Sequence, residues 1–65
     1  MKIVAHYKNE QLQTKGLKAL SIYRPKKQNE NGLPILSIKI TVVDDDIVNE
    51  LKRTSKPFLI EKKMR

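Results

Sequence analysis

The chain has 65 residues, and 14 Lys and Arg residues against 7 Asp and Glu residues give it a formal charge of +7 at pH 7. A chain of this length forms one domain at most, close to the lower size limit for independent folding. It contains no cysteine and one histidine, which excludes a disulfide scaffold, a cysteine-based zinc site and a thiol nucleophile. No apolar run is long enough for a membrane span or a signal peptide. We therefore expect residues 1–65 to form one basic, soluble domain in the cytoplasm.

The N-terminal segment is predicted to begin with a strand. Residues 2–8 mix β-branched and aromatic side chains in an alternating pattern, which is typical of a strand. Residues 9–17 have Asn9 at their start and Gly16 near their end, so we interpret them as a loop or a single helical turn.

A second strand is predicted over residues 18–25. Leu20 and Ile22 fall on one face of this segment, because successive side chains of a strand point to opposite faces. Pro25 closes the segment, and a proline ends a strand or confines its end to a sheet edge.

The clearest strand pattern spans residues 35–43. Apolar and polar side chains alternate there, as expected of a sheet with one buried and one solvated face. The apolar face consists of Leu36, Ile38, Ile40 and Val42. The polar face consists of Ser37, Lys39 and Thr41.

The connection between these two strands contains Asn31-Gly32, a dipeptide typical of two-residue hairpin turns. Such a turn would pair Ile22 with Thr41 and place an apolar face opposite a polar one. A shift of one residue removes this mismatch and pairs Tyr23 with Lys39. We therefore expect a loop of three or five residues, with its glycine at positive φ.

A helix is predicted over residues 44–56. It begins with three aspartates, Asp44 to Asp46, which provide an N-cap and place negative charge at the positive end of the helix dipole. Pro57 ends the helix, and residues 58–62 are predicted to return as the last strand.

Together these elements predict an α+β fold, an antiparallel sheet of about four strands with one short helix in the order β-β-β-α-β. The helix is expected to cover the apolar sheet face, with Phe58 or Leu59 closing one end of the core. Residues 40–51 and 56–61 resemble the strand–helix–strand passage of some OB-fold proteins that bind single-stranded nucleic acid. This resemblance adds an OB-like or partial barrel as an alternative form of the sheet. A core this thin predicts modest stability or a homodimer.

The sequence contains no recognisable catalytic or metal site. The three aspartates suit a helix cap better than a metal site, because adjacent side chains point in different directions. His6 has no nucleophile or orienting carboxylate placed beside it by the sequence, so we interpret it as a half-exposed strand residue beside Val4. The two glycines are too isolated for a phosphate-binding loop. We expect no enzymatic activity, no metal and no cofactor.

The basic residues remain as candidates for a functional site. Tyr23 and Lys39 are predicted to be neighbours on the solvated sheet face. An aromatic ring beside cations suits single-stranded nucleic acid, whose bases stack and whose phosphates pair with the cations. The candidate nucleic-acid-binding residues are Lys18, Tyr23, Arg24, Lys26, Lys27, Lys39, Lys62 and Lys63.

Two functions of different classes remain open. The first, which we favour, is a non-catalytic accessory protein of phage or mobile-element type that binds single-stranded DNA or RNA through a basic sheet face. The second is a protein-binding module or inhibitor that docks on an acidic partner surface or adds a strand to a sheet edge. Tyr23 among basic residues favours the first function, whereas the scarcity of aromatic residues favours the second. No feature indicates a membrane partner.

Overall fold

The fold is described by a computed structural model, which covers residues 1–41 and 45–63. Its elements follow the order β-α-β-β-α-β. The strands are β1 (Lys2–His6), β2 (Lys26–Glu30), β3 (Leu33–Lys39) and β4 (Leu59–Lys63). The helices are α1 (Glu10–Ala19) and α2 (Asp45–Thr54), and a short 3₁₀ turn, η1 (Ser21–Tyr23), follows α1.

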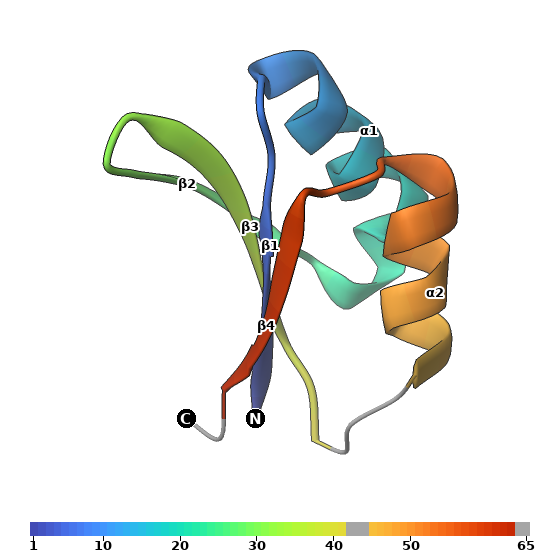
Figure 1. The fold of residues 1–65 in the computed structure, drawn as a ribbon. Helices are drawn as coiled ribbons and strands as arrows, with labels where there is room; N and C mark the ends of the chain where they lie inside the picture. The colour runs from blue at the N-terminus through green and yellow to red at the C-terminus, as the bar shows by residue number, and fades with distance from the viewer. Residues whose placement is uncertain (42–44, 64–65) are drawn as a thin grey trace.

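The four strands form one antiparallel sheet in the order β2-β3-β1-β4. Both helices lie on the same face of this sheet, and the other face is uncovered (Figure 1). The connectivity is the split β-α-β arrangement, also described as ferredoxin-like. The predicted α+β class and four-stranded antiparallel sheet are confirmed. The OB-like alternative does not apply, because β2 and β4 are the free edges of an open sheet.

The largest difference from the sequence prediction is α1, which replaces the expected loop and part of the expected second strand. The Asn9 side chain caps the helix by accepting a hydrogen bond from the Leu12 N–H at 3.0 Å, a favoured role for asparagine. The buried Gln13 amide donates to the backbone oxygens of Gln28 at 3.1 Å and Ile35 at 2.8 Å. The helix is therefore attached to the β2–β3 hairpin by hydrogen bonds that local sequence patterns do not reveal.

The predicted strand over residues 18–25 is wrong. Leu20 is buried at the end of α1, with 4% of its surface exposed, whereas Ile22 is 84% exposed in η1. The two side chains therefore share no face, and the additional helix changes the predicted order of elements. The strand next to β3 is instead the polar segment β2, all of whose residues are exposed.

The β2–β3 connection is a two-residue turn, so the predicted loop of three or five residues is wrong. Glu30 pairs with Leu33, and the φ angles of Asn31 and Gly32 are 52° and 81°, both positive as a type I′ turn requires. The predicted positive φ of the glycine is confirmed. The mismatch that argued against this turn does not arise, because Ile22 is not in a strand.

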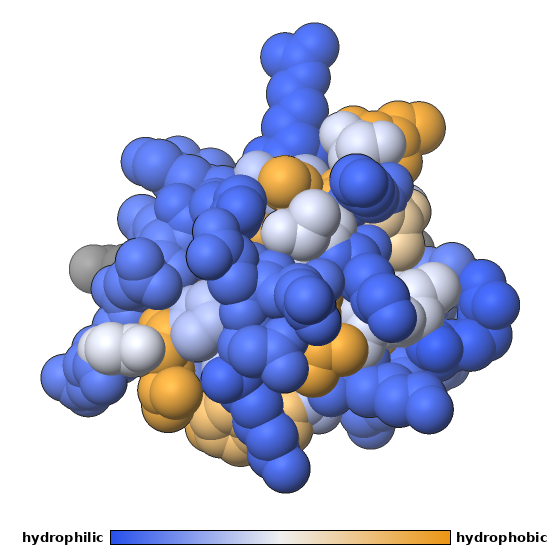
Figure 2. All heavy atoms as spheres, turned by 90° about the horizontal axis from the view of Figure 1, so that it is seen from above, coloured by the Kyte–Doolittle hydropathy of each residue, from blue (hydrophilic) through white to orange (hydrophobic). Residues whose placement is uncertain are grey.

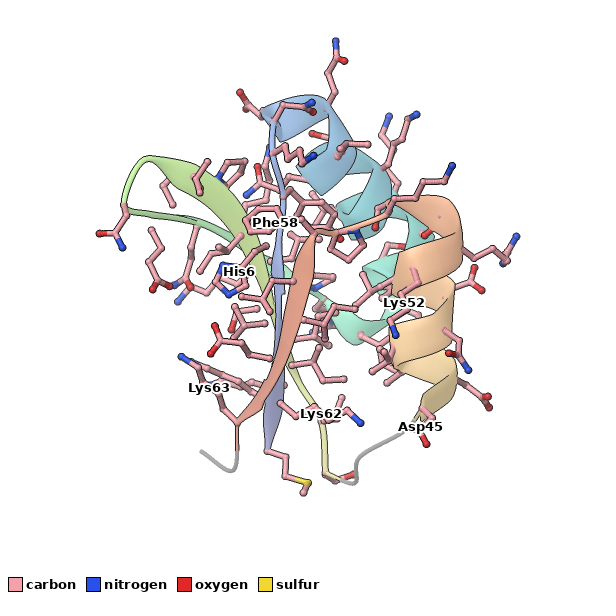
Figure 3. All side chains as sticks on the ribbon, in the orientation of Figure 1. His6, Asp45, Lys52, Phe58, Lys62 and Lys63 are labelled. Atoms are coloured by element: carbon pink, nitrogen blue, oxygen red, sulfur yellow. The ribbon has the colours of Figure 1, made fainter. Side chains whose placement is uncertain are left out.

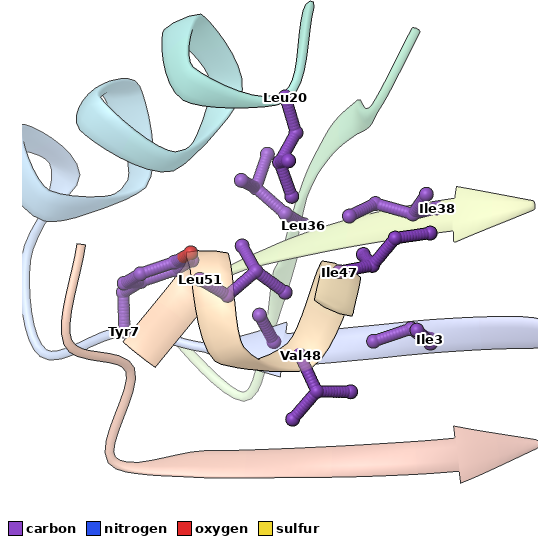
Figure 4. Packing of buried hydrophobic residues seen from close by; sticks show 9 residues of the cluster. Ile3, Tyr7, Leu20, Leu36, Ile38, Ile47, Val48 and Leu51 are labelled. Atoms are coloured by element: carbon purple, nitrogen blue, oxygen red, sulfur yellow. The ribbon is translucent and has the colours of Figure 1, made fainter. Parts of the chain in front are cut away.

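The hydrophobic core lies between the sheet and the two helices (Figure 4). It consists of Ile3, Ala5, Tyr7, Leu20, Leu36, Ile38, Ile47, Val48 and Leu51. Leu36 and Ile38 thus face the helices as predicted, and Ile40 packs at the margin of the core. Phe58 and Leu59 do not close the core, since they are 49% and 48% exposed.

The second helix, α2, confirms the helix predicted after the aspartates, although it ends at Thr54. Asp44, one of the aspartates predicted to provide the N-cap, and the predicted core residue Val42 lie outside the described residues. After α2, Lys56 adopts a φ of 48° and Pro57 follows, which directs the chain back to β4 at the edge of the sheet.

Tyr7 is expected to make the fold less stable in alkaline solution. Burial raises the pKa of its phenol above the ordinary value of 10.0, so the unfolded chain loses this proton at lower pH than the folded protein does. The resulting loss of stability begins as the pH rises past the unfolded pKa of about 10. Urea titrations at several pH values should show wild type losing stability relative to Tyr7→Phe above this pH. A constant difference between the two proteins would contradict the assignment.

Candidate nucleic-acid interface

Three lysines lie side by side across the uncovered face of the sheet. Lys2 is the register partner of Lys39 on β3 and of Lys63 on β4, and directly opposite residues project from the same face. Their chain neighbours Ile3 and Ile38 are buried under the helices, so the lysines occupy the opposite, uncovered face. We call Lys63, Lys2 and Lys39 the basic row.

The basic row is electrostatically unfavourable in the protein by itself. Like charges directly opposite each other destabilise a sheet. Within the part of the chain that the structure describes, none of the three lysines forms an ion pair with an acidic side chain. An anionic ligand at this position would relieve the repulsion.

A groove of about 390 Å³ extends the basic row towards β2. Its lining residues are Tyr23, Arg24, Pro25, Lys26, Ser37 and Lys39. Arg24 has a φ of 52°, and this left-handed residue ends η1 and turns the chain towards β2. Tyr23 and Lys39 are therefore brought together, although not as the predicted cross-strand pair, because Tyr23 lies in η1. Tyr23 is 42% exposed and also borders a second hollow beside Asp46 and Glu50 of α2.

The other predicted binding residues belong to the helix side of the molecule. Lys27 Nζ lies 3.6 Å from Glu10 Oε1, and Lys62 Nζ lies 3.3 Å from Asp45 Oδ1. Lys18 is exposed in the last turn of α1. Figure 3 shows the division at the end of β4, where Lys62 and Lys63 project from opposite faces. These three residues do not contribute to the basic row.

Lys2 was not among the candidates that the sequence indicated. Lys2 lies on the same face of β1 as Val4 and His6, but the sequence of β1 does not show that basic residues of the neighbouring strands flank Lys2 on both sides. Its position in the row depends on the register of β1 with β3 and β4. Only the strand pairing therefore identifies Lys2 as the central residue of the site.

His6 occupies the same face as the basic row, beside Val4 as predicted, but farther along β1. Its side chain is only 12% exposed, so the predicted half exposure is wrong, because Glu61 lies beside it. Its Nε2 lies 2.6 Å from Glu61 Oε1, and its ring centroid is 6.0 Å from that of Phe58. At this position the uncovered face therefore carries an acidic side chain, Glu61, beside the histidine. This end of the molecule, seen from above in Figure 2, shows hydrophilic side chains interrupted by separate apolar patches.

Among the described residues, no group of three or more His, Cys, Asp or Glu side chains is placed to hold a metal ion. No helix in that part of the chain has the length and apolar character needed to cross a membrane.

No family model matches the sequence, and neither a curated protein nor a solved structure is significantly similar to it. The connectivity of the sheet does not by itself indicate a function, whereas the basic row and its groove have the chemistry of a binding site for anions.

Proposed function

We propose that this protein binds single-stranded nucleic acid, without catalysis, through the basic row and the adjoining groove. The alignment of Lys63, Lys2 and Lys39 across three strands, without acidic partners among the described residues, carries the proposal. Phosphate groups would bind along this row, and the net charge of +7 would increase the rate of encounter with a polyanion.

Phosphate contacts are expected to dominate the affinity. Four-stranded sheets that recognise RNA bases use aromatic side chains on their open face. None of the four strands, all of which the structure describes in full, carries a Phe, Tyr or Trp side chain on this face. Tyr23, at the margin of the groove, is the ring placed to stack on a base beside the row. The proposed binding therefore has little sequence preference and a strong dependence on salt.

Two substitutions separate the two kinds of contact. Lys39→Ala should weaken binding to all single-stranded sequences and reduce the slope of log K against log salt by about 0.7, the value for one phosphate contact. Tyr23→Ala should weaken binding by about 1–3 kcal/mol with little change in slope, because it removes stacking. Fluorescence anisotropy of a labelled oligonucleotide at several salt concentrations measures both quantities.

The matched control is Lys18→Ala, which removes the same charge from the helix side of the molecule. We expect it to change the salt slope much less than Lys39→Ala does. Equal effects of the two lysine substitutions, together with no effect of Tyr23→Ala, would contradict the proposal and show that the lysines act as a diffuse charged coat.

A further inference from the structure

The two edges of the sheet differ in chemistry. Every residue of β2 is polar and exposed, and two lysines stand at its start, a composition that protects edge strands against pairing with other chains. The other edge strand, β4, instead begins with Leu59 and Ile60 directly after Phe58, and both Phe58 and Leu59 are half exposed. The first half of the β4 edge is therefore apolar, and lysines protect only its second half, at Lys62 and Lys63.

The β4 edge also presents backbone groups that can pair with another strand. The Tyr7 N–H donates to Pro34 O on β3 at 3.0 Å. Every second residue of β1, counted back from Tyr7, therefore points its backbone N–H and C=O groups towards β3. The residues between them point these groups towards β4. By the register of β1 with β4, the backbone groups of Ile60 and Lys62 must then point away from β1. These two residues offer outward N–H and C=O groups along the free edge.

A groove of about 320 Å³ lies beside this edge, between β4 and α2. It is lined by Val48, Lys52, Pro57, Phe58, Leu59, Ile60 and Lys62. Most of these side chains are apolar, and the two lysines project on the helix side of β4 (Figure 3). The contact of Lys62 with Asp45 is exposed, and such surface pairs contribute little free energy. An acidic side chain of a ligand could therefore replace Asp45 as the partner of Lys62.

We propose that the β4 edge binds an extended acidic segment of a partner protein by strand addition. The outward backbone groups of Ile60 and Lys62 pair with the added strand. An apolar side chain of that strand packs against Ile60 and Val48, and an acidic one pairs with Lys52 and Lys62. A second copy of the chain fits less well, because it also carries a charge of +7, and antiparallel pairing centred on Glu61 places two glutamates opposite each other.

The test uses a blocked synthetic peptide, Glu-Glu-Thr-Val-Val, whose antiparallel register places its acidic half opposite Lys62 and its apolar half opposite Ile60. Amide hydrogen exchange followed by NMR is the readout. At millimolar peptide, exchange of the Ile60 and Lys62 amides should slow several-fold, whereas the outward amide of Asn29 on β2 should not change. A peptide with lysines in place of the glutamates should bind at least about tenfold more weakly. Unchanged exchange at Ile60 and Lys62, or equal binding of the two peptides, overturns the proposal.

Backbone pairing is tested separately from charge by comparing Lys62→Pro with Lys62→Ala. Both remove the ammonium group, but only the proline removes the outward N–H, so it should bind the acidic peptide about tenfold more weakly than the alanine variant does. Asn29→Pro makes the same backbone change on the β2 edge and should leave peptide binding intact. Equal affinity of the two Lys62 variants, or equal loss in Asn29→Pro, overturns strand addition.

Two further variants keep the test decisive if a proline variant does not fold. Lys52→Glu should weaken peptide binding several-fold through charge reversal in the groove, and an unchanged affinity overturns the proposal. Lys39→Ala alters the basic row and should leave peptide binding unchanged, which separates this surface from the proposed nucleic-acid interface. An equal loss of peptide binding in Lys39→Ala would mean that the peptide binds the basic row, and would also overturn the proposal.

Discussion

Gly16→Ala is expected to destabilise the protein by roughly 1–3 kcal/mol, the usual effect of overpacking a core. In an exposed helix the same substitution stabilises by about 1 kcal/mol. The change in the free energy of unfolding expected here therefore has the opposite sign. A Cβ at position 16 would overlap the Tyr7 hydroxyl and lie 2.9 Å from Leu36 Cδ1 and 3.1 Å from Ser55 Oγ. It would therefore disturb the contact between the two helices and the sheet. Chemical denaturation followed by circular dichroism measures the change in the free energy of unfolding.

The Tyr7 hydroxyl is the group with which the added methyl would clash most severely. This hydroxyl donates to Ser55 Oγ at 2.7 Å, and the Ser55 hydroxyl in turn donates to Leu51 O at 3.0 Å. Tyr7→Phe removes the clashing oxygen, so it should recover part of the stability lost in Gly16→Ala, and the two effects should be non-additive. Lys15→Ala, an exposed substitution on α1, is the control and should change stability by less than about 0.5 kcal/mol. Stabilisation by Gly16→Ala would show that α1 does not pack this closely.

Ile38→Ala is expected to cost about 2–5 kcal/mol, because it leaves a cavity in the core. Ile38 of β3 is fully buried in the core between the sheet and the helices, and a domain of this size has little stability in reserve. A large fraction of the variant should therefore be unfolded at room temperature. Urea denaturation measures the loss, or shows that no folded baseline remains.

The neighbouring residue provides the control for Ile38→Ala. Lys39 lies on the uncovered face and is exposed, so Lys39→Ala should change the free energy of unfolding by less than about 0.5 kcal/mol. Equal losses in the two variants would mean that the faces of β3 are wrongly assigned. The Lys39→Ala variant must also be stable for its effect on nucleic-acid binding to be interpreted, and the same experiment establishes this.

Wherever a segment carries a clear apolar period, its structure could be predicted from the sequence. Alternation along β3 places Leu36 and Ile38 in the core and Ser37 and Lys39 on the uncovered face, as the structure confirms. The aspartates and the apolar stripe that follow indicated α2. These features depend on interactions within one segment and on the burial of its apolar side chains, so the local pattern contains the necessary information.

The sequence by itself therefore determined the α+β class, the basic charge and the two faces of β3, whereas tertiary contacts decided α1, β2 and the composition of the site. The polar residues of β2 form a strand because an edge needs only backbone pairing with β3 and no buried side chains. Residues 10–19 form a helix because Gly16 fits against Tyr7 and Gln13 reaches the β2–β3 backbone. The basic row joins residues 2, 39 and 63, which are far apart in the chain, because strand register alone sets which side chains are neighbours across a sheet.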